Sequence, residues 1–372
     1  MKKSRKLPLM MALAAIMLAP PQAEAKTEKH NLENPQVKAF YDQVTYPDDD
    51  YSYSLIKKYS QKTPYRLDQP WPVQVSWESS QPTDRLHVTV QELKPERRTV
   101  IDRDIDGHTS SYLIWNLTPN RTYAYSVADG DKVISKGKFR TTGRRRMIYA
   151  PSVHNVRDFG GQKTTDGHTL QYGKIYRGGQ LTFKGDRDEN RNSVVIQASE
   201  EDIRLMHDDL GIRAEIDFRF DHELGYNDDL DGNDINFSPL GQDVTYYNIQ
   251  THHGGDFEKD RLHGKVLRTV LSHLRRGEAV YVHCVAGADR TGMMCLLMEG
   301  LLGVSESDLL KDYELTTFSI YGHRHRDGHD MSHGLPMVKA FPGATLQEKI
   351  NNLFLDEGVT QAEIDEFKQL ML

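Results

Sequence analysis

The stretch "AVYVHCVAGADRTGMMCLLMEGLLG", residues 279–303, joins a strand pattern to a helix pattern through a short loop. Up to Cys284 it is apolar apart from His283, which predicts a buried strand. From Thr291 onward it is rich in Met and Leu, which predicts a helix. The residues between form a short loop from a strand end to a helix start, where α/β sheets bind their ligands.

The loop has the composition of an anion-binding site. Ala286, Gly287 and Ala288 carry so few side-chain atoms that the backbone can curl until successive N–H groups converge, and the helix N-terminus adds a partial positive charge. A helix N-terminus and a neighbouring cation favour the thiolate form of a cysteine. Arg290 can bind two oxygens of an anion with its planar guanidinium. Cys284 and Arg290 therefore predict that a bound phosphate is cleaved as well as held.

The rest of this part of the chain alternates between strand and helix patterns. Apolar strands separated by helical periods predict a mostly parallel central sheet flanked by helices, an α/β fold. The predicted strands are 174–179, 213–220, 244–249 and 279–284, and the predicted helices are 200–211, 265–277, 292–303, 305–318, 346–357 and 360–371.

Several motifs resemble one known family. His283, Cys284, Arg290 and Thr291 match the H-C-x5-R-T signature of the protein tyrosine phosphatase superfamily. Four further motifs resemble the bacterial secreted branch of tyrosine-specific phosphatases that also hydrolyse phosphoinositides: "HNVRDFGG" at 154–161, "IYRGGQL" at 175–181, "EIDFRFDHE" at 215–223 and "DLLKDYELT" at 308–316. The resemblance spans residues 150–372 and implies the cysteine phosphatase fold.

The resemblance also implies roles for the loop residues. Cys284 would attack phosphorus to form a phosphocysteine, and Thr291 would stabilise the thiolate when it leaves. His283 would order the loop. The oxygens of the phosphate would be held by Val285, Ala286, Gly287, Ala288, Asp289 and Arg290.

Three aspartates are candidates for the general acid. Asp289 matches an aspartate that the bacterial branch keeps inside the loop, and we favour it. Other phosphatases of the superfamily use an upstream loop, for which Asp243 and Asp256 are candidates. Alternatively, Asp289 only caps the helix.

Five charged residues in the outlying motifs could support the site, either as substrate contacts or as an ion-pair lattice beneath the loop. We favour the lattice for Arg157, Asp158, Arg177, Asp217 and Arg219.

The departures from the branch concern substrate preference. The branch often has Lys where Ala288 stands, and Gly178 or Gly179 replaces its serine. Phosphotyrosine is therefore the expected substrate, with phosphoinositides or inositol phosphates (a phytase-like activity) as the alternative. A second alternative, which is not an enzyme, is a non-catalytic phosphate-binding module.

We expect no cofactor and no metal, because this chemistry needs none. Histidines at 323, 325, 329 and 333 predict a polar flap over the site rather than a zinc site. Cys295 is expected to be a buried structural thiol.

The N-terminal half has a different pattern. Segments in which apolar and polar residues alternate over residues 70–143 predict an all-β sandwich, whose binding partner the sequence does not indicate. Within it, "NLTPNRTYAYSVADGDKVISKGKFRTTG" at 116–143 resembles the closing strands of a fibronectin type III module. The composition of residues 26–69 predicts an arm or linker with at most one short helix. The basic run "GRRRM" at 143–147 predicts a solvated linker. The tyrosine phosphatase-like domain is expected over residues 147–372.

The first 25 residues predict a secretory signal peptide: a basic start, an apolar run too short to span a membrane, and Ala-x-Ala before the cleavage point. Its removal would change the formal net charge from −7 to −10, because it takes away four basic residues and one acidic residue. This charge argues against nucleic acid as a partner. We therefore expect a bacterial periplasmic or secreted enzyme whose partners are phosphorylated proteins or small phosphorylated molecules.

Overall fold

The computed structural model describes residues 28–44, 46, 59, 67–78, 83–94, 97–187, 193–220, 223–224, 237–253 and 261–372. The predicted signal peptide and the candidate acid Asp256 lie outside these residues.

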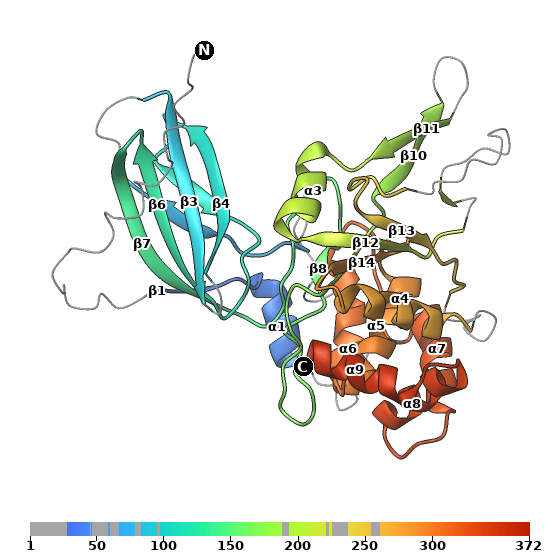
Figure 1. The fold of residues 1–372 in the computed structure, drawn as a ribbon. Helices are drawn as coiled ribbons and strands as arrows, with labels where there is room; N and C mark the ends of the chain where they lie inside the picture. The colour runs from blue at the N-terminus through green and yellow to red at the C-terminus, as the bar shows by residue number, and fades with distance from the viewer. Residues whose placement is uncertain are drawn as a thin grey trace, which may run out of the picture.

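The C-terminal part is built around a five-stranded sheet in the order β13-β12-β14-β9-β8 (Figure 1). Its strands are β8 (Arg157–Asp158), β9 (Ile175–Gly178), β12 (Ile212–Asp217), β13 (Thr245–Asn248) and β14 (Ala279–His283). Every pairing is parallel except that of β8 with β9. Because β14 is the middle strand, the sequence that follows it emerges at the centre of the sheet.

Helices cover both faces of this sheet. Val280 and Val282 of β14 pack into a large core beneath one face, whereas Ala279 and Tyr281 pack into a smaller core against the other face. This alternation follows from the two-residue period of a strand. The large core is formed with α4 (His263–Leu274), α5 (Asp289–Leu301), α6 (Glu306–Glu314), the 3-10 turn Leu315–Phe318, α7 (His329–Lys339), α8 (Leu346–Asp356) and α9 (Gln361–Met371). The small core includes α3 (Glu200–Arg204) and the π-helical turn Leu205–Asp209. The predicted α/β class is confirmed.

Two antiparallel strands extend beyond this sheet. They are β10 (Thr182–Arg187) and β11 (Ser193–Gln197), which form a hairpin.

The N-terminal part contains two further sheets. One has the order β1-β7-β6-β3-β4, and the other pairs β2 with β5. The strands are β1 (Glu28–Asn31), β2 (Val73–Ser76), β3 (Arg85–Lys94), β4 (Arg98–Asp106), β5 (Ser111–Ile114), β6 (Thr122–Asp129) and β7 (Lys132–Thr142). Side chains of both sheets, among them Val75, Val88 and Val127, share one apolar core.

Where it is described, the predicted arm is part of both folded regions. β1 pairs in parallel with β7, and the predicted short helix is α1 (Pro35–Gln43). Phe40 and Tyr41 of α1 belong to the large core of the α/β region. Figure 1 places α1 between the N-terminal sheets and the C-terminal helices.

The expectation of a solvated linker at 143–147 is wrong. Arg145 and Arg146 are buried, because each has a carboxylate partner, Asp312 and Asp158 respectively. Arg146 also donates to the backbone oxygen of Asn116 at 2.8 Å, which ties the two regions together.

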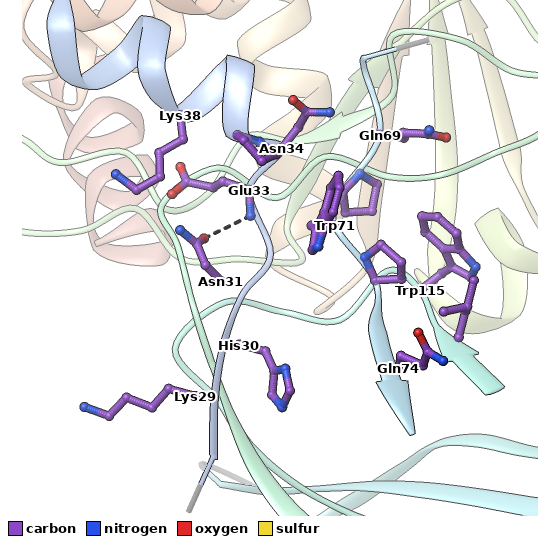
Figure 2. Close-up of a pocket in the computed structure, with 14 residues that line it drawn as sticks. Lys29, His30, Asn31, Glu33, Asn34, Lys38, Gln69, Trp71, Gln74 and Trp115 are labelled. Atoms are coloured by element: carbon purple, nitrogen blue, oxygen red, sulfur yellow. Dashed lines mark hydrogen bonds between the residues drawn. The ribbon is translucent and has the colours of Figure 1, made fainter. Parts of the chain in front are cut away.

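A pocket of about 770 Å³ lies where β1, the start of α1 and residues 69–74 meet (Figure 2). Its apolar walls come from Pro70, Trp71, Pro72 and Trp115. No residue of the 283–292 loop lines this pocket.

Candidate active site

Cys284 follows the last residue of β14 and is buried. The His283 ring lies beside it, with Nε2 2.8 Å from Oε1 of Glu215 on β12 and Nδ1 3.0 Å from the Cys284 carbonyl oxygen. The histidine therefore fixes the backbone that carries the thiol.

Gly287 makes the tight turn of the loop possible. Its φ is +64°, and a Cβ atom there would lie 2.0 Å from the carbonyl oxygen of Gly178 at the end of β9. Both the left-handed backbone and the close approach exclude a side chain at this position. A serine is also disfavoured at Gly178, where a Cβ atom would lie 2.4 Å from the Tyr281 hydroxyl.

Three successive carbonyl groups of the loop are held by donors outside it. The Gln180 amide donates to Val285 O at 3.0 Å, Nδ2 of Asn155 donates to Ala286 O at 2.9 Å, and Nη2 of Arg177 donates to Gly287 O at 2.7 Å. In a planar trans peptide the N–H points away from the C=O of the same unit. The amides of residues 286–288 are therefore turned away from these donors, as an anion cradle requires.

Arg290 lies in the first turn of α5 and is oriented by a carboxylate. Its Nη1 and Nη2 donate to the two oxygens of Glu223 at 2.6 and 2.8 Å, and Nη1 also donates to Phe218 O at 3.2 Å. Glu223 is the last residue of the "EIDFRFDHE" motif, but sequence reasoning did not assign it to the site.

Beneath the loop lies a buried ion-pair lattice centred on Asp312. Its carboxylate accepts from Arg157 at 3.1 Å and from Arg177 at 2.6 Å, and it also pairs with Arg145. Burial alone would raise the pKa of Asp312, but the three guanidinium groups lower it. Arg157 and Arg177 are about 1% exposed, so neither guanidinium is open to a substrate in solvent. This arrangement agrees with the ion-pair interpretation of these two arginines.

The other three predicted support residues lie in separate contacts. Asp158 pairs with Arg146 and accepts from the amides of Gly160 and Gly173, so it does not reach the loop. Asp217 and Arg219 pair with each other at 2.7 Å. Burial would raise the pKa of Asp217, but His283 and Arg219 lower it.

Asp289 is held by two residues that sequence reasoning missed. Its carboxylate accepts from the Tyr313 hydroxyl at 2.9 Å and from Nε and Nη2 of Arg324 at 2.7 and 3.0 Å. Arg324 belongs to the histidine-rich segment predicted as a flap, and its contact with Asp289 places that segment beside the loop. Asp243 instead pairs with His207 and Arg213. It precedes β13 and so lies at the opposite edge of the sheet from Cys284, which makes it unsuitable as the acid.

The Thr291 hydroxyl is buried, and among the described residues it has no hydrogen-bond partner. Cys295 is buried in the core, and burial raises its pKa to about 12. A thiol with so high a pKa is structural rather than reactive.

Within the described residues, two groups have ligand atoms close enough to hold a metal ion: Glu215, Asp217 and His283, and His253, Asp289 and Asp330. In the first group, Asp217 is paired with Arg219 and Glu215 with His283. In the second group, Asp289 is paired with Arg324, and Asp330 is paired with His253. The hydrogen bond to Asp330 raises the pKa of His253. In each group one carboxylate is therefore already paired with an arginine. The four histidines of the flap contribute to neither group.

Among the described residues, no helix is both long and apolar enough to cross a bilayer.

Comparison with known proteins gives the family. A curated protein from Cupriavidus necator, named as a candidate tyrosine-protein phosphatase, is 22% identical over 187 residues; the match spans 46% of this chain and 63% of that relative. Among solved structures, TpbA of P. aeruginosa is 18% identical with a TM-score of 0.31, covering 51% of this chain and 90% of TpbA. PTPMT1, solved in complex with PI(5)P, is 14% identical with a TM-score of 0.28, covering 50% of this chain and 93% of PTPMT1. The profile of the tyrosine phosphatase family matches residues 148–361, more than half of the chain. The chain therefore belongs to the tyrosine phosphatase family, as its sequence motifs predicted.

Proposed function

We propose that this protein is an exported, cysteine-dependent protein-tyrosine phosphatase of the bacterial secreted branch. In the first step the Cys284 thiolate attacks phosphorus, the S–P bond forms, the ester P–O bond breaks, and the phenolate leaving group takes a proton from a general acid. In the second step a water oxygen attacks phosphorus and gives a proton back to the general acid, now a carboxylate, while the S–P bond breaks and inorganic phosphate and the thiolate are released.

The observation that carries this proposal is the outward anchoring of Val285, Ala286 and Gly287 by Gln180, Asn155 and Arg177. Amides turned toward the phosphate stabilise the charge on its oxygens without reorganisation during the reaction. Because Arg290 is already oriented by Glu223, it can bind the same oxygens through its remaining donor capacity. Phosphoryl transfer depends chiefly on this kind of positioning and charge stabilisation.

Thr291 and Asp289 would assist the two leaving groups, the thiolate and the phenolate. The buried Thr291 hydroxyl would donate to the thiolate when it leaves in the second step. Asp289 would protonate the phenolate, and Tyr313 and Arg324 would hold its carboxyl in place between turnovers.

Phosphotyrosine is the proposed substrate class. Ala288, at the position where the branch often has Lys, is fully buried and offers no cation for a second phosphate. We also propose that residues 70–143 are a fibronectin type III-like module, that residues 147–372 are the catalytic domain, and that residues 1–25 direct export.

The test is steady-state hydrolysis of phosphotyrosine peptides, phosphoserine peptides, phosphoinositides and phytate, under reducing conditions with a chelator present. Cys284→Ser is the matched control, because it removes the nucleophile and leaves the loop. Phosphate release from phosphotyrosine peptides alone, lost in Cys284→Ser, supports the proposal. Faster turnover of phytate or phosphoinositide would replace the substrate class, and no turnover of any substrate would indicate a phosphate-binding module.

A further inference from the structure

The residue that holds the Ala286 carbonyl, Asn155, is itself unusually placed. It is fully buried and has a φ of +60°, a left-handed conformation that few residues other than glycine adopt. Its Nδ2 also donates to Oγ1 of Thr316 at 2.9 Å, and its Oδ1 accepts from Nη1 of Arg157 at 2.7 Å. The Asn155 side chain thus joins the catalytic loop to the ion-pair lattice.

The backbone of Asn155 is anchored from far away in the sequence. Its N–H donates to Oδ2 of Asp68 at 2.6 Å, and Asp68 is fully buried. Asp68 lies outside residues 148–361, the part that matches the family, and within the segment predicted as an arm.

Asp68 is held in register by its neighbour. The Leu67 amide donates to Phe318 O at 3.1 Å, and the Leu67 side chain belongs to the large core of the α/β region. The carboxylate is therefore delivered to Asn155 by a docked segment rather than by a free arm.

We propose that Asp68 is a positioning residue of the catalytic loop, so that the functional phosphatase unit includes a segment before the family domain. It acts through Asn155: the Asp68 carboxylate fixes the strained backbone of Asn155, and the Asn155 amide fixes the Ala286 carbonyl. A buried amide without an acceptor would leave the left-handed conformation, and the carbonyl groups of the loop would lose one of their three anchors. This inference rests on the proposed function.

The experiment compares Asp68→Ala and Asp68→Asn in the full chain, with Asp42→Ala as the matched control. Asparagine keeps an acceptor oxygen at the same position, whereas alanine keeps none. Asp42 is an exposed aspartate of the same N-terminal region that pairs with Lys38. The measurements are kcat and KM for p-nitrophenyl phosphate, inhibition by inorganic phosphate, and the thermal unfolding midpoint.

We expect Asp68→Ala to lower kcat/KM about tenfold or more and to weaken inhibition by inorganic phosphate to a similar extent. Asp68→Asn and Asp42→Ala should stay within about threefold of the wild type in both quantities. A merely destabilising change would lower the active fraction, and hence kcat, while KM and phosphate inhibition stayed constant.

Unchanged phosphate inhibition in Asp68→Ala, or equal damage in Asp68→Asn and Asp68→Ala, would overturn the proposal. If Asp68→Ala does not fold, Asp68→Ser replaces it, because its hydroxyl is too short to reach the amide. If the wild type hydrolyses nothing, the proposed function fails, and calorimetric binding of inorganic phosphate to the same variants still decides the role of Asp68.

Discussion

The two oxygens of Glu223 accept hydrogen bonds from Nη1 and Nη2 of Arg290 at 2.6 and 2.8 Å. This paired geometry fixes the plane of the guanidinium before any ligand binds, and in the proposed mechanism the same guanidinium binds the phosphate. It also places an acidic side chain, about 20% exposed, beside the proposed anion-binding site. Glu223 would help catalysis by orienting Arg290, because the negative charge of Glu223 alone would repel a phosphate.

Removing Glu223 should therefore impair catalysis even though a negative charge is lost. We expect Glu223→Ala to lower kcat/KM for p-nitrophenyl phosphate by about 10- to 100-fold, because Arg290 loses two charge-assisted hydrogen bonds. Glu223→Gln should retain more activity, since its amide still offers one acceptor. Increased activity in Glu223→Ala would show that repulsion outweighs orientation.

If Asp289 is the general acid, the effect of Asp289→Asn should depend on the leaving group. With phenyl phosphate, whose leaving phenolate is strongly basic, we expect kcat to fall by about 100-fold or more. With p-nitrophenyl phosphate the loss should be much smaller, because that phenolate leaves without a proton. Asp243→Asn is the control, since Asp243 pairs with His207 and Arg213 and should leave both rates unchanged. Equal losses with both substrates would assign Asp289 a structural role.

The turn at Gly287 should tolerate no side chain. We expect Gly287→Ala to abolish detectable phosphate binding, because its Cβ atom would overlap the Gly178 carbonyl. Gly211→Ala is a matched control: Gly211 also has a positive φ, +69°, but a Cβ atom there meets nothing within 4 Å. Gly211→Ala should lower the free energy of unfolding by only about 1 kcal/mol and leave activity intact. Isothermal calorimetry with inorganic phosphate measures the first effect, and denaturant unfolding measures the second.

Glu299 should make the protein less stable as pH rises. Burial first, and then the nearby Asp312 carboxylate, raise its pKa to about 8 from an ordinary value of 4.5. Between these values the folded state keeps a proton that the unfolded state has lost, so the free energy of unfolding falls by up to about 1.4 kcal/mol per pH unit. Glu299→Gln keeps an acceptor for the Gln162 amide, which donates to Oε1 at 2.6 Å, and removes the titration.

We therefore expect the free energy of unfolding of Glu299→Gln to vary less between pH 5 and pH 8 than that of the wild type. Urea unfolding at several pH values measures it. Parallel pH dependences for the two proteins would contradict a protonated Glu299 in the folded state.

Sequence determined the parts of this protein that depend on neighbours along the chain. The strand, the loop with its small residues and the helix after Cys284 are one continuous stretch, so their geometry follows from local conformation. The continuous apolar run of β14 likewise predicted a buried strand, and its side chains alternate between the two cores. Cys284, Arg290 and the loop amides could be named as candidates from the composition of this stretch and from its match to a family signature.

Which distant residues complete the candidate site depends on how the chain folds in three dimensions. Glu223 follows β12, whose carboxyl end lies beside that of β14, and Asn155 precedes β8, which runs antiparallel to β9 and so begins at the same edge of the sheet. Arg324 comes from the segment after α6 and the 3-10 turn, and it reaches the loop through Asp289. The same geometry excludes Asp243, which precedes its strand and lies at the other edge. Arg145 and Asp68 belong to segments whose local composition suggests exposed linkers, and they are buried because their charged groups find partners on other elements. Spacing in a sequence carries no information about such partners, since the free energy that buries a charge comes from contacts that exist only after the chain has folded.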